Sequence, residues 1–208
     1  YEPGNIAVAD LDGDGTQEVV QYQYNFGPGR DYREEDGGIF IYAHDGALIR
    51  RIPVAIGQSL FGFLAIADAD GDGAPDILFT AHGILYAYRA DGRLLWAFLI
   101  PDRPVPIGVF VPAATDLNYR NGRSSPQVYD LDLDGRPEVI LNTSARLYIL
   151  DGKTGLEKDS FDNEGSGFSP ETVALADFDD DGHVDILSVS NERWNCSVLT
   201  GGPVPCEG

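Results

Sequence analysis

Acidic side chains are concentrated in four short loops that share one spacing. The loops begin at residues 10, 68, 130 and 177 and read DLDGDGTQE, DADGDGAPD, DLDLDGRPE and DFDDDGHVD. All four fit the pattern D-x-D-x-D-G-x-x-[DE], in which acids at positions 1, 3 and 5 alternate with other residues and an acid at position 9 closes the loop. One such stretch alone is compatible with a solvated turn, a catalytic acid cluster or a metal loop. Four copies in one chain are not an accident of composition.

The spacing of the acids favours a metal loop over the other two interpretations. In a tight loop, alternating acids turn their oxygens towards one centre, and the glycine at position 6 permits the sharp reversal of the chain. Position 7 then offers a backbone carbonyl. This set supplies the hard oxygen ligands that Ca²⁺ takes, whereas Mg²⁺ demands a stricter octahedron and retains waters. Carboxylates gathered without a cation repel one another by about 1 kcal/mol per pair near 4 Å, even in water.

We therefore expect about four Ca²⁺ ions, each held by the side chains at positions 1, 3, 5 and 9 and by the residue at position 7. The predicted metal-binding residues are Asp10, Asp12, Asp14, Thr16 and Glu18; Asp68, Asp70, Asp72, Ala74 and Asp76; Asp130, Asp132, Asp134, Arg136 and Glu138; and Asp177, Asp179, Asp181, His183 and Asp185.

An EF-hand is the competing type of calcium loop, and the sequence excludes it. The EF-hand loop has twelve residues, closes with a Glu at position 12 and is flanked by helices. Here position 12 is Gln21, Phe79, Leu141 or Ser188, and strand-like runs follow each loop.

The segments around the loops predict the elements that position them. An apolar segment precedes each loop (NIAVA, FLAIA, PQVY, TVALA), and a strand-like run follows it (EVVQYQY, DILFTA, EVILNT, DILSVS). A third strand-like segment ends in an Asp-Gly turn in the first three units, which is a strong hairpin signal. Each unit thus reads as a meander of up to four strands. The nearly continuous apolar character of FLAIA and DILFTA predicts strands that are covered on both faces.

Four-stranded units repeated at roughly 40–60 residues are typical of the blades of a β-propeller. The predicted fold class is all-β, a β-propeller of four antiparallel four-stranded repeats that either closes as a four-bladed ring or is part of a seven- or eight-bladed one. The expected domain is a single propeller over 1–208, with approximate blades 1–56, 57–115, 116–165 and 166–208.

Composition and charge limit the partners. The formal net charge is −20, which argues against nucleic acid and against an anionic membrane surface. No run of apolar residues approaches the eighteen that a membrane span needs. The chain begins with Tyr1 and contains no methionine, so we expect a processed product or a piece of a longer protein. Cys196 and Cys206 are expected to form a disulfide; two free thiols in a reducing compartment are the alternative.

With these motifs in place, the four units resemble FG-GAP/VCBS repeats, the calcium-binding propeller repeats also found in integrin α-subunits. The second unit, FGFLAIADADGDGAPDILF, carries Phe61-Gly62 at the family's position before the first strand. Its Gly73-Ala74-Pro75 lies inside the metal loop, whereas the family's GAP follows the second strand, so that match is a coincidence of letters. The resemblance implies a propeller with Ca²⁺ in loops on one rim, stabilising each blade.

Two functions follow from the sequence. The first is a non-enzymatic extracellular, cell-surface or periplasmic interaction and adhesion module that binds a protein or glycan through rim loops. No G-x-S-x-G, P-loop or dinucleotide fingerprint is present, and no catalytic residue is assigned. The alternative is a polysaccharide-active enzyme or a fragment of one, because the opening GNIAVADLDGDG also resembles propeller lyases of the rhamnogalacturonan type. Further blades, either of a larger chain or of a partner chain, are also candidate partners.

Overall fold

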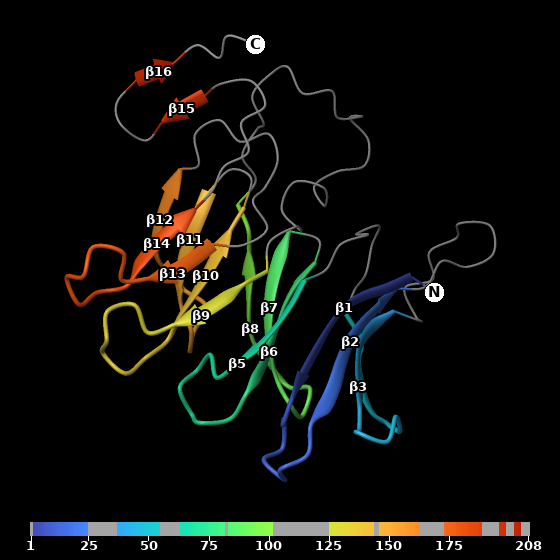
Figure 1. The fold of residues 1–208 in the computed structure, drawn as a ribbon. Helices are drawn as coiled ribbons and strands as arrows, with labels where there is room; N and C mark the ends of the chain where they lie inside the picture. The colour runs from blue at the N-terminus through green and yellow to red at the C-terminus, as the bar shows by residue number, and fades with distance from the viewer. Residues whose placement is uncertain are drawn as a thin grey trace, which may run out of the picture.

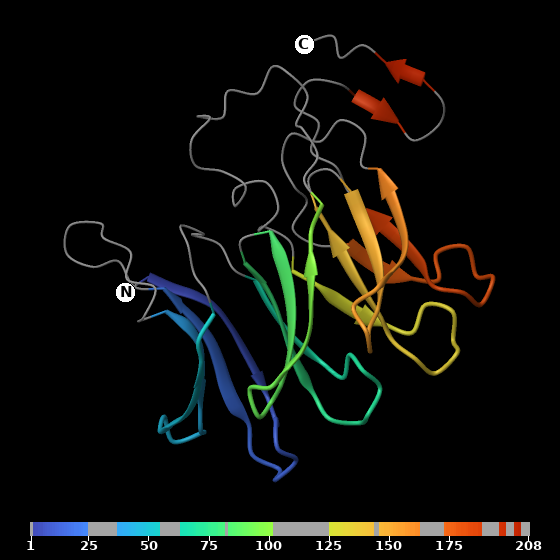
Figure 2. The ribbon, with the colours of Figure 1, turned by 180° about the vertical axis from the view of Figure 1, so that it is seen from behind.

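The fold is an arc of antiparallel sheets that stand side by side, each built from consecutive segments of the chain (Figures 1 and 2). It is known from a computed structural model, which describes residues 2–24, 37–54, 63–81, 83–101, 125–143, 146–162, 173–188, 196–198 and 202–204. Over these residues all regular structure is β-strand. The all-β propeller class predicted from the repeats is confirmed.

Three sheets have four strands in simple sequential order, as the predicted meanders require. The first contains β1 (Glu2–Ala9), β2 (Glu18–Tyr24), β3 (Gly38–Tyr42) and β4 (Leu48–Ile52). The second contains β5 (Phe63–Ala67), β6 (Asp76–Ala81), β7 (Ile84–Arg89) and β8 (Leu94–Leu99). The third contains β9 (Gln127–Tyr129), β10 (Glu138–Asn142), β11 (Arg146–Asp151) and β12 (Glu157–Asp162).

The fourth unit differs from the other three within the described residues. Strand β13 (Val173–Ala176) pairs with β14 (Asp185–Ser188), and β15 (Cys196–Val198) pairs with β16 (Gly202–Val204), but the two pairs are separate two-stranded sheets. Cys206 lies outside the described residues, so the predicted bridge to Cys196 stays a prediction. No helix in the part of the chain that the structure describes is long and apolar enough to cross a membrane.

Neighbouring sheets bury their faces against each other, which is why a single unit would not be stable alone. Successive side chains of a strand point to opposite faces, so a strand between two sheets must be apolar throughout. Strand β6 shows this: Ile77 and Phe79 pack in the core shared with the first sheet, and Leu78 packs in the core shared with the third. Strand β10 does the same between the second sheet and the fourth unit, with Val139 on one side and Ile140 on the other.

The prediction of two covered faces holds for DILFTA but not for FLAIA. All six residues of β6 are buried, whereas in β5 only Leu64 is. The reason is position in the sheet: β5 is the edge strand of its sheet and β6 lies inside it. The same order of strands places the loops β1–β2, β5–β6, β9–β10 and β13–β14 in a row along one edge of the arc, dark blue to orange in Figure 1.

Candidate metal centre

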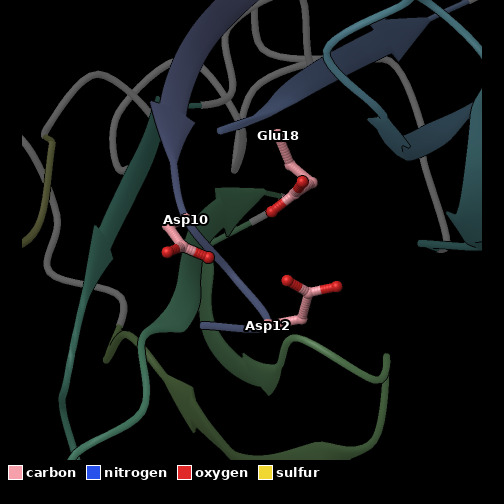
Figure 3. A group of neighbouring side chains, drawn as sticks. All are labelled: Asp10, Asp12 and Glu18. Carbon is pink, nitrogen blue, oxygen red and sulfur yellow. The ribbon is translucent and has the colours of Figure 1, made fainter. Parts of the chain in front are cut away.

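Each acidic loop connects the first two strands of its unit, and it brings three carboxylates together. The acids at positions 1, 3 and 9 place one oxygen each within 4.8 Å of the others in all four loops. The four groups are Asp10, Asp12 and Glu18; Asp68, Asp70 and Asp76; Asp130, Asp132 and Glu138; and Asp177, Asp179 and Asp185. Figure 3 shows the first group, in which all three carboxylates turn towards one space between the end of β1 and the start of β2.

The acid at position 1 shapes the loop by accepting backbone hydrogen bonds. Asp10 Oδ1 accepts from the N–H of Asp14 at 3.1 Å, and its Oδ2 accepts from the N–H of Gly15 at 2.9 Å. Its counterparts Asp68, Asp130 and Asp177 accept from positions 5 and 6 of their own loops in the same way. This explains why a short acceptor must begin every loop, since Asp bonds the backbone that follows it more readily than a longer side chain.

Left-handed backbone at two positions completes the reversal. Position 6 is glycine in every loop, and φ there lies between +84° at Gly135 and +89° at Gly73 and Gly182. Position 4 is also left-handed, with glycine in the first two loops but Leu133 (φ 58°) and Asp180 (φ 62°) in the others. The sequence rule of an invariant glycine therefore applies to position 6 only.

The closing acid at position 9 belongs to the protein interior in three loops. Glu18 is 4%, Asp76 1% and Glu138 2% exposed. Each accepts the N–H of position 2 of its loop, for example from Leu11 to Glu18 Oε2 at 2.9 Å and from Leu131 to Glu138 Oε2 at 2.8 Å. Asp185 makes the same bond, from Phe178 at 2.9 Å, without being buried. The closing acid thus ties the start of the second strand to the start of the loop.

The acids at position 5 accept hydrogen bonds from the backbone of their own loops. Asp14, Asp72, Asp134 and Asp181 are not members of the three-carboxylate groups. Each instead accepts the N–H of the residue at position 7, at 2.7–3.0 Å, through its Oδ1. The Thr16 hydroxyl also donates to Asp14, and this bond holds the pKa of Asp14 below its usual value. Position 7 therefore contributes its N–H to the loop's own structure, beside the carbonyl predicted as a ligand.

The carboxylate groups fit a hard divalent cation. Ca²⁺ binds oxygens at about 2.3–2.6 Å, so two oxygens on one ion lie up to about 5 Å apart, and the 4.8 Å separation meets this limit. The electrostatics of Asp76 point the same way. Burial raises the pKa of this carboxyl to about 6; the charge of Asp70 adds to the shift, and backbone hydrogen bonds oppose it. A buried carboxylate beside another carboxylate is costly unless a cation compensates it.

Two basic side chains that the sequence did not single out also reach these loops. Arg89, at the end of β7, forms ion pairs with Asp70 and Asp72. Lys158, in β12, lies 2.6 Å from Glu138 and 3.1 Å from Asp132. A signal for Arg89 existed, because it stands two residues before the Asp91-Gly92 turn that ends β7. The register of β6 with β7 places it opposite Asp76. For Lys158 there was none, because it lies beside an irregularity in the pairing of β11 with β12.

Comparisons with known proteins agree with the repeat and with the fold. Residues 130–188, which include the third and fourth loops, match the FG-GAP-like repeat family model. No curated protein matches the chain in sequence. Among solved structures, Bacillus licheniformis rhamnogalacturonan lyase PL11 is 20% identical with a TM-score of 0.59, over 90% of this chain and 40% of that one.

Two further structures show how varied the proteins with this fold are. The V. cholerae biofilm matrix protein Bap1 is 22% identical with a TM-score of 0.55, over 86% of this chain and 23% of that one. BBS1N, solved in complex with ARL6DN, is 14% identical with a TM-score of 0.52, over 85% of this chain and 49% of that one. The chain spans less than half the length of each of the three. At these identities the likeness concerns the fold alone.

Proposed function

We propose that this chain, whose residues 130–188 match the FG-GAP-like repeat and whose fold is that of a β-propeller, is a calcium-stabilised interaction module. The observation that carries the proposal is repetition. The same three-carboxylate group recurs at the same place in all four units, between the first two strands. A catalytic centre needs one such arrangement, whereas a stabilising ion is useful in every blade.

Calcium would act here by replacing repulsion with attraction in each loop. The acids at positions 1, 3 and 9 would hold the ion, and Ca²⁺ would neutralise the charge that they bring together. Because the closing acid is the first residue of the second strand, an ion at this place would fasten the loop to the sheet. The acids at position 5 and the carbonyls at position 7 would join the set through a local change of the loop.

The proposed location is extracellular, cell-surface or periplasmic. Extracellular modules operate with calcium affinities of about 10⁻⁴–10⁻³ M, and only compartments rich in calcium saturate such sites. In this setting the predicted disulfide between Cys196 and Cys206 would also persist. The ligand would be a protein or a glycan bound through rim loops, in keeping with a fold shared by a biofilm matrix protein.

Calcium binding is tested by calorimetry on chelator-treated protein and by thermal melting with Ca²⁺ or EDTA. We expect saturable binding of several ions and a melting temperature that EDTA lowers and excess Ca²⁺ restores, with Mg²⁺ as the weaker control. Ligand saturation at about 100 times Kd stabilises a protein by about 2.7 kcal/mol per site, so the shift is measurable. No heat of binding and no effect of EDTA would contradict the proposal.

A polysaccharide lyase is the second candidate, favoured by the structural similarity to rhamnogalacturonan lyases over 90% of this chain. The two functions differ in one measurement. Incubation with acidic polysaccharides, followed by ultraviolet absorbance of unsaturated products, would show turnover for a lyase and none for an interaction module. A glycan-binding assay on the same polysaccharides, with and without EDTA, would detect the binding that we propose.

A further inference from the structure

The four loops are alike in sequence but not in what surrounds them. In the second loop the guanidinium of Arg89 lies between two acids, with Nη2 at 2.5 Å from Asp70 Oδ2 and Nη1 on Asp72. In the third loop the ammonium of Lys158 lies between Asp132 and Glu138. Among the described residues, no Lys or Arg forms an ion pair with the three-carboxylate groups of the first and fourth loops.

Both cations engage acids that belong to the candidate metal groups. Asp70 and Asp132 are the position-3 acids of their loops, and Glu138 is a closing acid. The side chain of Asp70 is 6% exposed, so its pair with Arg89 is largely removed from water. A cation at hydrogen-bond distance from a ligand occupies one of the lone pairs that an ion needs, and it repels a divalent ion at the same place.

The two cations reach their loops from different strands, so they are not part of the common repeat. Arg89 ends β7 and pairs across the sheet with Asp76; the residue in the same relation to Glu138 is Asp151. Lys158 lies in β12, where the register with β11 shifts between Ile149 and Leu150. Each of these two loops has acquired a cation in its own way.

We propose that Arg89 and Lys158 are built-in competitors for the metal, which lower the calcium affinity of the second and third loops and hold these loops together when no ion is bound. The inference rests on the proposed function, because it concerns the same sites. It divides the four sites into two kinds. Over the described residues, no Lys or Arg pairs with the ligand acids of the first and fourth loops, whereas the second and third loops carry part of the charge compensation within the chain.

The test measures calcium affinity after the cation is removed. The starting protein is Asp10→Asn/Asp177→Asn, which disables the first and fourth loops and leaves the second and third loops to titrate. Into it we would introduce Arg89→Gln or Lys158→Gln, each of which keeps a polar side chain and removes one positive charge. Matched controls are Arg93→Gln and Lys153→Gln, which alter the net charge equally at exposed positions of the same two units.

We expect Arg89→Gln and Lys158→Gln each to raise the affinity of one site by about tenfold or more, from the repulsion of a unit charge and a divalent ion at contact distance. The control variants should change it much less. In EDTA, where no ion is bound, both variants should melt at a lower temperature than the controls because an ion pair has been lost.

The outcomes separate this inference from the proposed function. If the wild-type chain binds Ca²⁺ but Arg89→Gln and Lys158→Gln alter affinity no more than the controls do, the inference is overturned and the function stands. If the wild-type chain binds no Ca²⁺ at all, the proposed function fails and the inference fails with it. Because Arg89 and Lys158 are replaced in separate proteins, a variant that does not fold leaves the other to decide.

Discussion

The indole nitrogen of Trp96 donates a 2.7 Å hydrogen bond to the carbonyl oxygen of Gly152, and this buried bond joins the second sheet to the third. Gly152 also donates its N–H to the carbonyl of Pro137, in the third acidic loop, at 3.0 Å. A Cβ on Gly152 would lie 2.5 Å from that carbonyl oxygen and closer still to the carbonyl of Ala69, in the second loop. Two acidic loops and the core between their sheets therefore meet at one glycine.

Replacing either partner of this contact should loosen the packing between the second and third sheets. Gly152→Ala places a methyl group against the backbone carbonyls of Ala69 and Pro137, and we expect a loss of at least about 2 kcal/mol of unfolding free energy. Trp96→Phe keeps a ring but leaves the Gly152 carbonyl without its indole donor, at a cost of about 1–3 kcal/mol. Urea denaturation measures both. Leu99→Ala on the same strand is the control, because Leu99 is 70% exposed.

The closing acid of the first loop should have two separable roles. Glu18→Ala leaves the buried N–H of Leu11 without its acceptor, so we expect a loss of about 1–3 kcal/mol even in EDTA. Glu18→Gln keeps an oxygen acceptor of the same size and removes the charge. That variant should retain most of its stability in EDTA and gain less from added Ca²⁺ than the wild type. Equal stability of the Ala and Gln variants in EDTA would show that the backbone bond contributes nothing.

Gly15 should be required for its conformation and not for the space around it. Its φ is +87°, and among the described residues no heavy atom beyond its two chain neighbours lies within 4 Å of a Cβ built on it. Gly15→Ala should therefore cost about 1–2 kcal/mol through the left-handed backbone alone. Gly15→Asn should cost less, since Asn tolerates this region better. Thermal melting of the two variants checks the order, and an alanine variant as stable as the wild type would contradict it.

Stability should fall in alkaline solution because of a buried phenol. Burial raises the pKa of Tyr88 above its ordinary value of 10.0, and the neighbouring Tyr86 adds to the shift. The folded state therefore holds the Tyr88 proton more tightly than the unfolded chain does. The resulting stabilisation is fully present below the unfolded pKa and is lost as pH rises through the higher folded pKa.

Melting temperature measured from neutral to alkaline pH checks this prediction. Tyr88→Phe carries no titrating group at this position, so its alkaline loss should be smaller than that of the wild type. Identical alkaline profiles for the two proteins would mean that Tyr88 has no part in the pH dependence.

Much of the fold could be predicted because its determinants are local in the sequence. The nearly continuous apolar character of DILFTA predicts a strand covered on both faces, and β6 is buried along its whole length. EVILNT is predicted as a strand, and β10 is also buried throughout. The Asp-Gly turns predict the hairpins of the first three units, and the four-stranded order follows. FLAIA has the same apolar character but forms an edge strand, and an edge position is a property of the sheet that no local pattern records.

The sequence by itself determined the four acidic loops, because the ligand spacing and the glycine at position 6 lie within nine residues of each other. Only the tertiary structure decided which acids converge. Positions 1, 3 and 9 do so, while position 5 bonds the loop's own backbone. It also decided that Arg89 and Lys158 enter two of the loops, since each is brought there by pairing between strands. The spacing of acids along the chain sets which ligands a loop offers, and contacts across the sheet set which charges surround those ligands.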